Sequence, residues 1–430
     1  MRQGVTPRRR LDGDVSLPGD KSISHRAAIL NSLAHGTAVI SNYGPGEDCL
    51  STLRCLASLG IDITQTATDQ LTLIGSDREL EEPTNVLDAG NSGTTMRLLA
   101  GVLAGQQFHS ILTGDPSLRS RPMGRIIEPL QSMGAIIHGR GNDTLPPLSI
   151  LGGPLQGLDY ALPVPSAQLK SCLLLAGLSA TGKSVIREPT QSRDHTERML
   201  INMGASLTIL GDTITVSPSR LKAQNVVIPG DISSGAFWIV AGVVHPDSRL
   251  LIRNVGINQT RRGVIDVLRQ MGANLHIKNE RVEGGEEVGD IYVTSSNLEG
   301  IEISGPIIPR VIDELPILAV AACFAKGKTL IRDAGELRLK ETDRIRAMGH
   351  ELNRMGGDLE ETADGLVING PKTLHGAHCS SHGDHRVAMS LAIAGLMATG
   401  ETVIDGAECT AVSYPQFWEH LESLGGKSYC

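Results

Sequence analysis

The apolar positions of the chain gather in six short stretches that are hydrophobic nearly all round and rich in alanine and glycine. A helix that is apolar on every face is a buried helix. The pattern therefore predicts six buried helices, and a glycine follows five of them closely, as is typical of helix ends. The six stretches are 26–34, 94–104, 169–180, 234–244, 316–325 and 387–399.

A second pattern alternates with the first one along the chain. Six amphipathic stretches each end in a leucine or methionine followed by glycine, just before a strand-like run. Glycine at this point is typical of the left-handed residue that terminates a helix. The pairs are Leu59-Gly60, Met133-Gly134, Met203-Gly204, Met271-Gly272, Met355-Gly356 and Leu424-Gly425.

Together the two patterns form a long repeat, since successive glycines of the second pattern lie 68 to 84 residues apart. Each copy supplies one buried helix, one outer helix and a few strands. Six copies divide into two domains of three, with helices inside and strands outside. We expect the division near 225–231, where Pro229-Gly230 interrupts the chain. If the buried helices run parallel, their N-termini converge and favour an anion.

Length and charge narrow the class of protein. A chain of 430 residues is too long for one ordinary core, and its net charge of −8 argues against general affinity for nucleic acid or acidic membranes. Any anion must therefore be bound by a local cluster. No apolar run approaches the ~20 residues that span a bilayer, and no signal peptide is recognisable. Seven scattered cysteines favour a reducing cytoplasm.

The start of the first buried helix carries groups suited to an anion. Pro18-Gly19 breaks the chain, and Ser22 or Ser24 is expected to cap the helix that follows. Lys21, Ser22 and Arg26 then lie within a turn of backbone N–H groups that lack partners. Two cations and a hydroxyl in that position suit a phosphate or carboxylate. The alternative is an ordinary capped helix with solvated charges.

Other predicted helix starts in the first half carry related groups. Gly90 and Gly93 allow a ligand to approach the backbone closely, although such a turn alone is weak evidence. Three arginines within 119–125 suit carboxylates or phosphates, or else form a solvated surface. Ser166 is expected to cap the third buried helix, with Gln168 beside the helix start.

In the second half, acidic residues stand before the helices. Asp313-Glu314 precedes Pro316, a residue that suits the first helical turn. Glu341 and Arg344 are three residues apart and are expected to pair. A solvated, salt-bridged surface is the alternative for both segments.

Two patterns suggest other chemistry and are not favoured. His382 and His385 have no third metal ligand at a telling spacing, so capping by Asp384 and anion binding are preferred to a metal. The segment 177–184 matches the P-loop pattern, but there a helix ends and Lys183-Ser184 opens a strand, which inverts the context that a P-loop needs. A nucleotide-binding kinase is therefore the weak alternative.

A family resemblance rests on eight segments, which are 18–22 with Arg26, 90–94, 121–123, 166–170, 193–196, 313–316, 340–344 and 384–386. Together these segments resemble the 5-enolpyruvylshikimate-3-phosphate synthases, a branch of the enolpyruvyl transferase family, over nearly the whole chain. The resemblance implies a two-domain inside-out α/β barrel with three βαβαββ units per domain. It also implies that the first strand belongs with the second domain. The expected domains are 19–229 and 1–18 plus 230–430, with the active site in the cleft between them.

The resemblance further implies a reaction. The 5-hydroxyl of shikimate 3-phosphate adds to the enol carbon of phosphoenolpyruvate, and inorganic phosphate then leaves a tetrahedral intermediate. No metal or organic cofactor is implied, and we expect a monomer that binds neither nucleic acid nor membranes. Two anionic substrates need many cations, while the addition needs a base for the hydroxyl and a proton for the methylene carbon.

Residue roles follow from the same resemblance. Asp313 would take the hydroxyl proton, Glu341 would move the methylene proton, and Lys21 would assist as an acid. The residues implied for shikimate 3-phosphate are Lys21, Ser22, Arg26, Ser166, Ala167, Gln168, Arg193, Asp313 and Lys340. Those implied for phosphoenolpyruvate are Lys21, Gly93, Arg121, Gln168, Arg344 and Arg386.

The chain departs from the family pattern at two of these places. Val412 stands where many members have a lysine, so one phosphoenolpyruvate contact is absent or replaced. Ala167 stands where many have a second serine, so only its backbone can bind. The segments 19–21, 166–170 and 258–261 resemble the members that tolerate the inhibitor glyphosate. Gly93, however, is the small residue that usually admits this inhibitor, so tolerance stays open.

The nearest rival within the family is the enzyme that transfers enolpyruvate to UDP-N-acetylglucosamine. Its pattern places a cysteine in the loop before the Arg-Pro motif. The corresponding segment here, 114–120, contains none, which favours the shikimate reaction.

Overall fold

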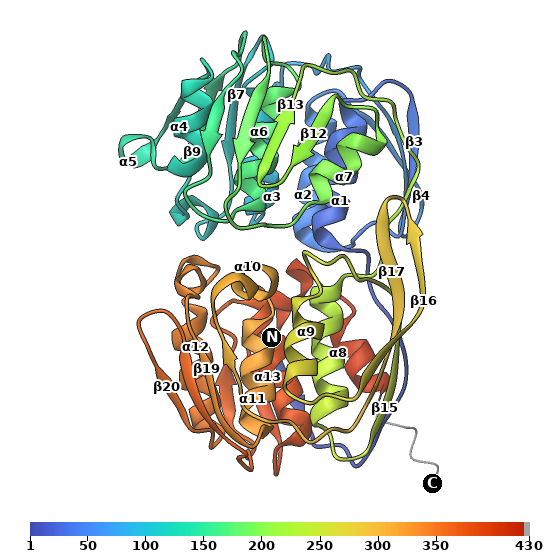
Figure 1. Cartoon of the computed structure of the whole chain (residues 1–430), viewed down its shortest axis with the longest axis vertical. Helices are drawn as coiled ribbons and strands as arrows, with labels where there is room; N and C mark the ends of the chain where they lie inside the picture. The colour runs from blue at the N-terminus through green and yellow to red at the C-terminus, as the bar shows by residue number, and fades with distance from the viewer. Residues whose placement is uncertain (425–430) are drawn as a thin grey trace. The chain divides into compact units, whose positions relative to one another are not determined.

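The computed structural model describes residues 1–424 of the chain. The chain divides into two compact units, each with its own hydrophobic core (Figure 1). The first domain consists of Gly19–Ile228 with Glu283–Glu286, and the second of Met1–Pro18, Pro229–Val282 and the chain from Glu287 on. Pro229 thus lies with the second domain, and four residues of the second half lie with the first.

Six helices are buried on nearly every face, as the hydrophobic pattern predicts. Three lie inside the first domain and three inside the second. Their apolar side chains form the two cores, although α1 also buries polar residues, among them His25, Arg26 and Asn31. The helices are α1 Lys21–Ser32, α3 Gly93–Leu103, α6 Ala167–Gly177, α8 Ile232–Val244, α11 Leu315–Phe324 and α13 His385–Met397.

Six outer helices carry the predicted amphipathic pattern. Glycines 60, 134, 204, 272 and 356 follow the first five at φ between 85° and 101°, which confirms their role as left-handed terminators. The sixth, Gly425, lies outside the described residues. The helices are α2 Glu47–Ser58, α4 Gly124–Ser132, α7 His195–Asn202, α9 Gly263–Gln270, α12 Arg344–Arg354 and α14 Phe417–Ser423. The shorter helices are α5 Arg140–Asp143 and α10 Ile308–Val311, with 3₁₀ turns η1 Leu118–Ser120, η2 Gly305–Ile307, η3 Gly335–Leu339 and η4 Ala407–Val412.

The first domain contains three open four-stranded sheets, ordered β14-β3-β5-β4, β6-β7-β9-β8 and β10-β11-β13-β12. The strands are β3 Thr37–Ser41, β4 Asp62–Ala67, β5 Gln70–Ile74, β6 Leu87–Asp88, β7 His109–Thr113, β8 Ile136–Gly139, β9 Leu145–Leu151, β10 Asp159–Ala161, β11 Ser184–Arg187, β12 Leu207–Leu210, β13 Thr213–Val216 and β14 Val226–Val227. The P-loop-like segment indeed lies between the end of α6 and the start of β11, in the order that a P-loop does not have.

The second domain repeats this arrangement with sheets ordered β16-β17-β15-β2, β18-β19-β21-β20 and β1-β23-β22. The strands are β1 Arg2–Val5, β2 Leu11–Ser16, β15 Ser248–Gly256, β16 Leu275–Glu283, β17 Glu286–Thr294, β18 Glu302–Ile303, β19 Gly327–Ile331, β20 Leu359–Glu361, β21 Leu366–Gly370, β22 His378–Ser380 and β23 Thr402–Asp405. None of the sheets closes on itself within the described chain, so each domain is an inside-out α/β fold of separate sheets around buried helices.

The repeat is a βαβαββ unit, seen directly in the order β6-α3-β7-α4-β8-β9. Two units, however, exchange their first strand. β2 precedes α1 in the chain but pairs in parallel with β15, while β14 precedes α8 but pairs in parallel with β3. β1 pairs with β23, so both N-terminal strands belong to the second domain, as the resemblance implied.

Candidate active site

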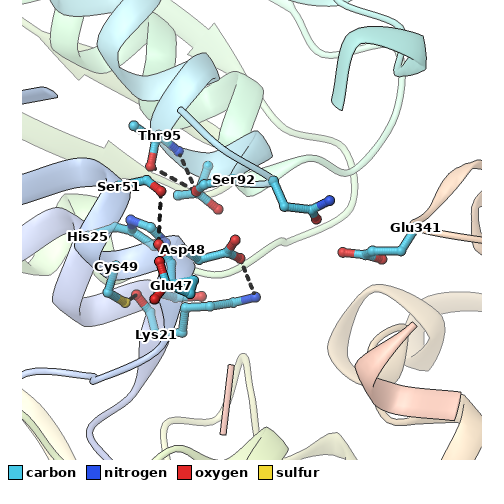
Figure 2. A network of polar contacts seen from close by, with 12 residues as sticks. Lys21, His25, Glu47, Asp48, Cys49, Ser51, Ser92, Thr95 and Glu341 are labelled. Carbon is cyan, nitrogen blue, oxygen red and sulfur yellow. Dashed lines mark hydrogen bonds and ion pairs between the residues drawn. The ribbon is translucent and has the colours of Figure 1, made fainter. Parts of the chain in front are cut away.

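The start of α1 carries two of the predicted residues in fixed positions. The N-cap is Asp20, whose Oδ1 accepts a hydrogen bond from the Ile23 backbone N–H at 2.9 Å, so the predicted Ser22 or Ser24 cap was wrong. Lys21, the first residue of the helix, points toward the start of α2 and forms an ion pair with Asp48, with Nζ 3.0 Å from Oδ2 (Figure 2). The carboxylate limits the positions that this lysine adopts.

Arg26 lies one turn further along α1 and is buried. Its guanidinium donates hydrogen bonds to Thr196 Oγ1 at 2.6 Å and to Ser171 Oγ at 2.9 Å. Burial is the main cause that lowers the pKa of Arg26 to about 10, with Arg193 adding to it. Arg193 in turn lies 3.4 Å from Ser22 Oγ, so these two arginines and the Ser22 hydroxyl form one group.

Gln168 is held at the start of α6 by two partners on α3. Arg97 donates to Gln168 Oε1 at 2.6 Å, and Gln168 Nε2 donates to Thr94 Oγ1 at 2.8 Å. Gly93 opens α3 beside this pair, and a Cβ there would lie 2.8 Å from Arg97 and 3.5 Å from Arg121. The missing side chain therefore leaves room between two guanidinium groups.

Arg121 is positioned by the turn before α3. Its guanidinium donates to Asn91 Oδ1 at 2.8 Å and to the Asn91 carbonyl at 3.3 Å. Asn91 is itself fixed by a 2.6 Å hydrogen bond to Asp115. The glycine-rich turn at residues 90–93 thus holds the guanidinium of Arg121 in place. This contact supports an anion site at the turn, for which the sequence motif alone was weak evidence.

The first domain also contains a triad of buried charged side chains. Lys170 Nζ is 2.6 Å from Glu188 Oε2 and 2.7 Å from Glu197 Oε1, and all three side chains are at most 5% exposed. Glu197 directly follows Thr196, the hydroxyl that Arg26 contacts. The triad therefore joins α6 to α7 at the level of Arg26. Burial lowers the pKa of Arg26, and the negative charge of Glu197 acts against this lowering.

In the second domain, three carboxylates surround the buried Arg344 at the start of α12. Its atoms lie 2.6 Å from Glu341, 2.8 Å from Asp384 and 3.6 Å from Asp313. Burial alone would lower the pKa of Arg344, but the charges of Asp384, Glu341 and Asp313 outweigh it and raise the pKa. The predicted pairing of Glu341 with Arg344 is confirmed, although Glu341 precedes the helix, which is capped by Asp343.

The starts of the three buried helices of the second domain meet around Glu314. This carboxylate, the N-cap residue of α11, accepts a hydrogen bond from Ser233 in the first turn of α8. It also lies 3.9 Å from Arg386 at the start of α13. Arg261 lies 3.7 Å from the same oxygen. The helix starts therefore converge within this domain, as the repeat predicted.

The remaining predicted residues lie at these helix starts. Lys340 Nζ is 3.4 Å from Asp313 Oδ1, Ser166 caps α6, and Ala167 is the first residue of α6. Asp384 caps α13 as expected. Val412 is half-buried at the end of η4.

Sequence reasoning missed several partners of these residues. Asp48, Arg97, Thr196 and Ser171 were given no part in the site, although they hold Lys21, Gln168 and Arg26 in place. One signal was available: Arg97 lies one turn after Gly93, so its side chain lies close to the start of the same helix. Nothing local in the sequence pairs Asp48 with Lys21 or Thr196 with Arg26, because those contacts join different helices.

Fold and site define a two-domain α/β protein that gathers arginines and lysines at the starts of buried helices, an arrangement suited to enzymes acting on anionic substrates. Residues 5–421 match the family model described as EPSP synthase (3-phosphoshikimate 1-carboxyvinyltransferase). The chain belongs to this family.

Close relatives cover almost the full chain. A 3-phosphoshikimate 1-carboxyvinyltransferase of Desulforudis audaxviator is 53% identical over 98% of both chains. The enzyme of that name from Herpetosiphon aurantiacus is 52% identical over 99% of both. Among solved structures, the EPSP synthase of Acinetobacter baumannii has a TM-score of 0.88 and 42% identity, covering 99% of this chain and 98% of its own. Among the described residues, no helix is long and apolar enough to pass through a membrane.

Proposed function

We propose that the chain transfers the enolpyruvyl group of phosphoenolpyruvate to the 5-hydroxyl of shikimate 3-phosphate, releasing inorganic phosphate. Family membership over residues 5–421 carries the reaction class. The observation that carries the assignment of residues is the clustering, within each domain, of the side chains that this chemistry needs. We place the enzyme in the cytoplasm as a monomer.

The first domain supplies the cations for binding. Arg26, Arg193 and the Ser22 hydroxyl form one group, which we assign to shikimate 3-phosphate together with Ser166, Ala167 and Gln168. A phosphate oxygen accepts hydrogen bonds from guanidinium and hydroxyl donors, and the free backbone N–H groups at a helix start add to them. Arg121 and the space at Gly93 are assigned to phosphoenolpyruvate, with Gln168 close to both substrates.

The second domain supplies groups that move protons. Asp313 has Lys340 at 3.4 Å and Arg344 at 3.6 Å, which stabilise its charged form and suit a base for the 5-hydroxyl. Glu341 is assigned to the proton on the methylene carbon of phosphoenolpyruvate, with Lys21 of the first domain as a further acid. Arg344 and Arg386 are assigned to phosphoenolpyruvate and Lys340 to shikimate 3-phosphate, so residues of both domains serve the same reaction.

The atoms of the proposed reaction balance without a cofactor. The 5-hydroxyl oxygen bonds to C2 of phosphoenolpyruvate, its proton goes to the base, and C3 gains a proton to become a methyl group. Loss of phosphate from C2 and of one methyl proton then restores the double bond. An acid and a base that exchange roles between addition and elimination meet both steps.

The test is phosphate release from phosphoenolpyruvate with either shikimate 3-phosphate or UDP-N-acetylglucosamine as acceptor. We expect release only with shikimate 3-phosphate. Release with the sugar nucleotide alone, or with neither acceptor, contradicts the proposal. ATP hydrolysis that requires Lys183 would instead support the kinase interpretation.

A further inference from the structure

Away from the candidate active site, two histidines approach one buried carboxylate. His350 and Glu351 lie near the end of α12, and His382 lies in the loop between β22 and α13. His350 Nδ1 is 3.1 Å and His382 Nε2 is 2.9 Å from Glu351 Oε1. Each of the three ligand atoms lies within 4.8 Å of the other two.

The carboxylate is fixed while the rings are accessible. The Glu351 side chain is 1% exposed, whereas His350 and His382 are 57% and 36% exposed. The second oxygen, Glu351 Oε2, is buried. The Ser380 backbone and the Cys379 side chain also hydrogen-bond to this carboxylate. Arg354 forms a long ion pair with Glu351 Oε2, with Nε 3.9 Å away. A carboxylate oxygen has two lone pairs, so Glu351 Oε1 can bind a cation in place of the hydrogens of the histidines.

We propose that His350, Glu351 and His382 bind a divalent transition-metal ion, with Zn²⁺ the preferred one and water as the remaining ligand. Two imidazoles and one carboxylate are a donor set that zinc takes in proteins. Ligand bonds of about 2.0–2.2 Å in a tetrahedron place neighbouring donor atoms roughly 3.3–3.5 Å apart. The observed 2.9 and 3.1 Å separations therefore need to widen by only a few tenths of an ångström.

Binding is accompanied by movement of a proton. A histidine nitrogen that donates a hydrogen bond to Glu351 must lose its proton before it coordinates a metal. That proton passes to the other ring nitrogen or to solvent, and both rings are exposed enough to allow it.

The fold, rather than the sequence, supplies the third ligand. His382 and His385 are neighbours in the chain, but His385 is buried at the first position of α13 and is not part of the cluster. His382 instead meets two residues of α12, more than thirty positions earlier. A bound ion would tie the end of α12 to the loop before α13, so its effect is on stability and not on the chemical step.

The test uses tag-free, full-length protein that has been treated with a chelator and then titrated with ZnCl₂. Calorimetry should show one saturable site per chain, and zinc should raise the melting temperature. His350→Ala and His382→Asn should each weaken binding at least about tenfold, the loss expected when an interaction of about 1.4 kcal/mol is removed. Asparagine is chosen because His382 has φ of 52°, which asparagine tolerates.

His378→Ala is the matched control. His378 is also exposed and lies on β22, but it pairs with Asp405 and is outside the cluster. This variant should bind zinc like the wild type. The proposal is overturned if the wild type has no saturable site, or if His350→Ala and His382→Asn bind as tightly as His378→Ala does.

Discussion

Arg26 in the first domain and Arg344 in the second are both buried near helix starts, yet their surroundings are opposite. Arg26 donates to the neutral hydroxyls of Thr196 and Ser171, and burial lowers its pKa to about 10. Arg344 contacts three carboxylates, which raise its pKa. The same architecture therefore places one buried arginine against hydroxyl groups and the other against carboxylates.

This difference shows how the same βαβαββ unit can hold a buried arginine in two chemically different surroundings. A buried guanidinium that donates to hydroxyl groups is suited to bind an anionic substrate, whereas carboxylates gathered around an arginine are held in place by it. Lys170 contributes to the contrast, because it engages Glu197, the carboxylate next to Thr196. The groups proposed as proton carriers, apart from Lys21, therefore lie in the second domain, whereas substrate-binding residues are proposed in both domains.

The largest effect is expected for Glu341→Gln, which removes the proton carrier but keeps the shape of the side chain. Turnover should fall by about 10²- to 10⁴-fold, the usual contribution of general acid–base catalysis. Binding of shikimate 3-phosphate, measured by calorimetry, should stay near the wild-type value. Glu360→Gln, an exposed substitution on β20, is the control. Lost binding in Glu341→Gln, or retained turnover, would contradict the role proposed for Glu341.

Lys170→Met should reduce the free energy of unfolding by about 3–5 kcal/mol, because it leaves two carboxylates buried without their cation. Urea unfolding measures this loss. Lys183→Met, an exposed position, should change neither stability nor turnover. Lys170→Met with wild-type stability would show that the triad does not hold α6 and α7 together.

Arg26→Lys keeps the charge but loses the forked donor that reaches Thr196 and Ser171. The KM for shikimate 3-phosphate should rise by about 10- to 100-fold, equivalent to roughly 1.4–2.7 kcal/mol, with a smaller change in kcat. Steady-state kinetics with each substrate varied in turn provide the measurement. Arg54→Lys on the exposed face of α2 serves as the control. An equal rise in KM for both substrates would argue against the assignment of Arg26.

The smallest effect concerns His25, which is buried between Lys21 and Arg26 on α1. Burial first, and then these two cations, lower the pKa of His25 well below 6.5. The unfolded chain therefore binds a proton at His25 more readily than the folded chain does. As a result, the free energy of unfolding falls as the pH drops below about 6.5. The loss should approach about 1.4 kcal/mol per pH unit.

Urea unfolding between pH 7.5 and 5 measures the His25 effect. His25→Asn should reduce this slope, while the exposed His109→Asn should retain it. Equal slopes in wild type and His25→Asn would show that His25 has the same pKa in the folded and the unfolded chain.

The sequence by itself determined the repeat of buried and outer helices, and it predicted which residues stand at the starts of the buried helices. Stretches that are apolar on every face have no alternative to burial, and the glycines after the first five amphipathic stretches mark the ends of those helices. The local pattern was sufficient for these elements. The pairing of Glu341 with Arg344 was also predicted, because the two residues are only three positions apart. The cap of α1 was misjudged, since Asp20 competes with Ser22 and Ser24 for the same role.

Only the tertiary structure decided which segments far apart in sequence meet. The exchange of β2 and β14 between the two domains leaves no local signal, because both strands precede a buried helix in the same way. The partners Asp48 for Lys21, Thr196 for Arg26 and Glu351 for His382 are likewise contacts between separate elements. The periodicity of apolar residues predicts which face of a helix or strand is buried. Only the packing of the elements in three dimensions determines which side chain of another element lies opposite that face.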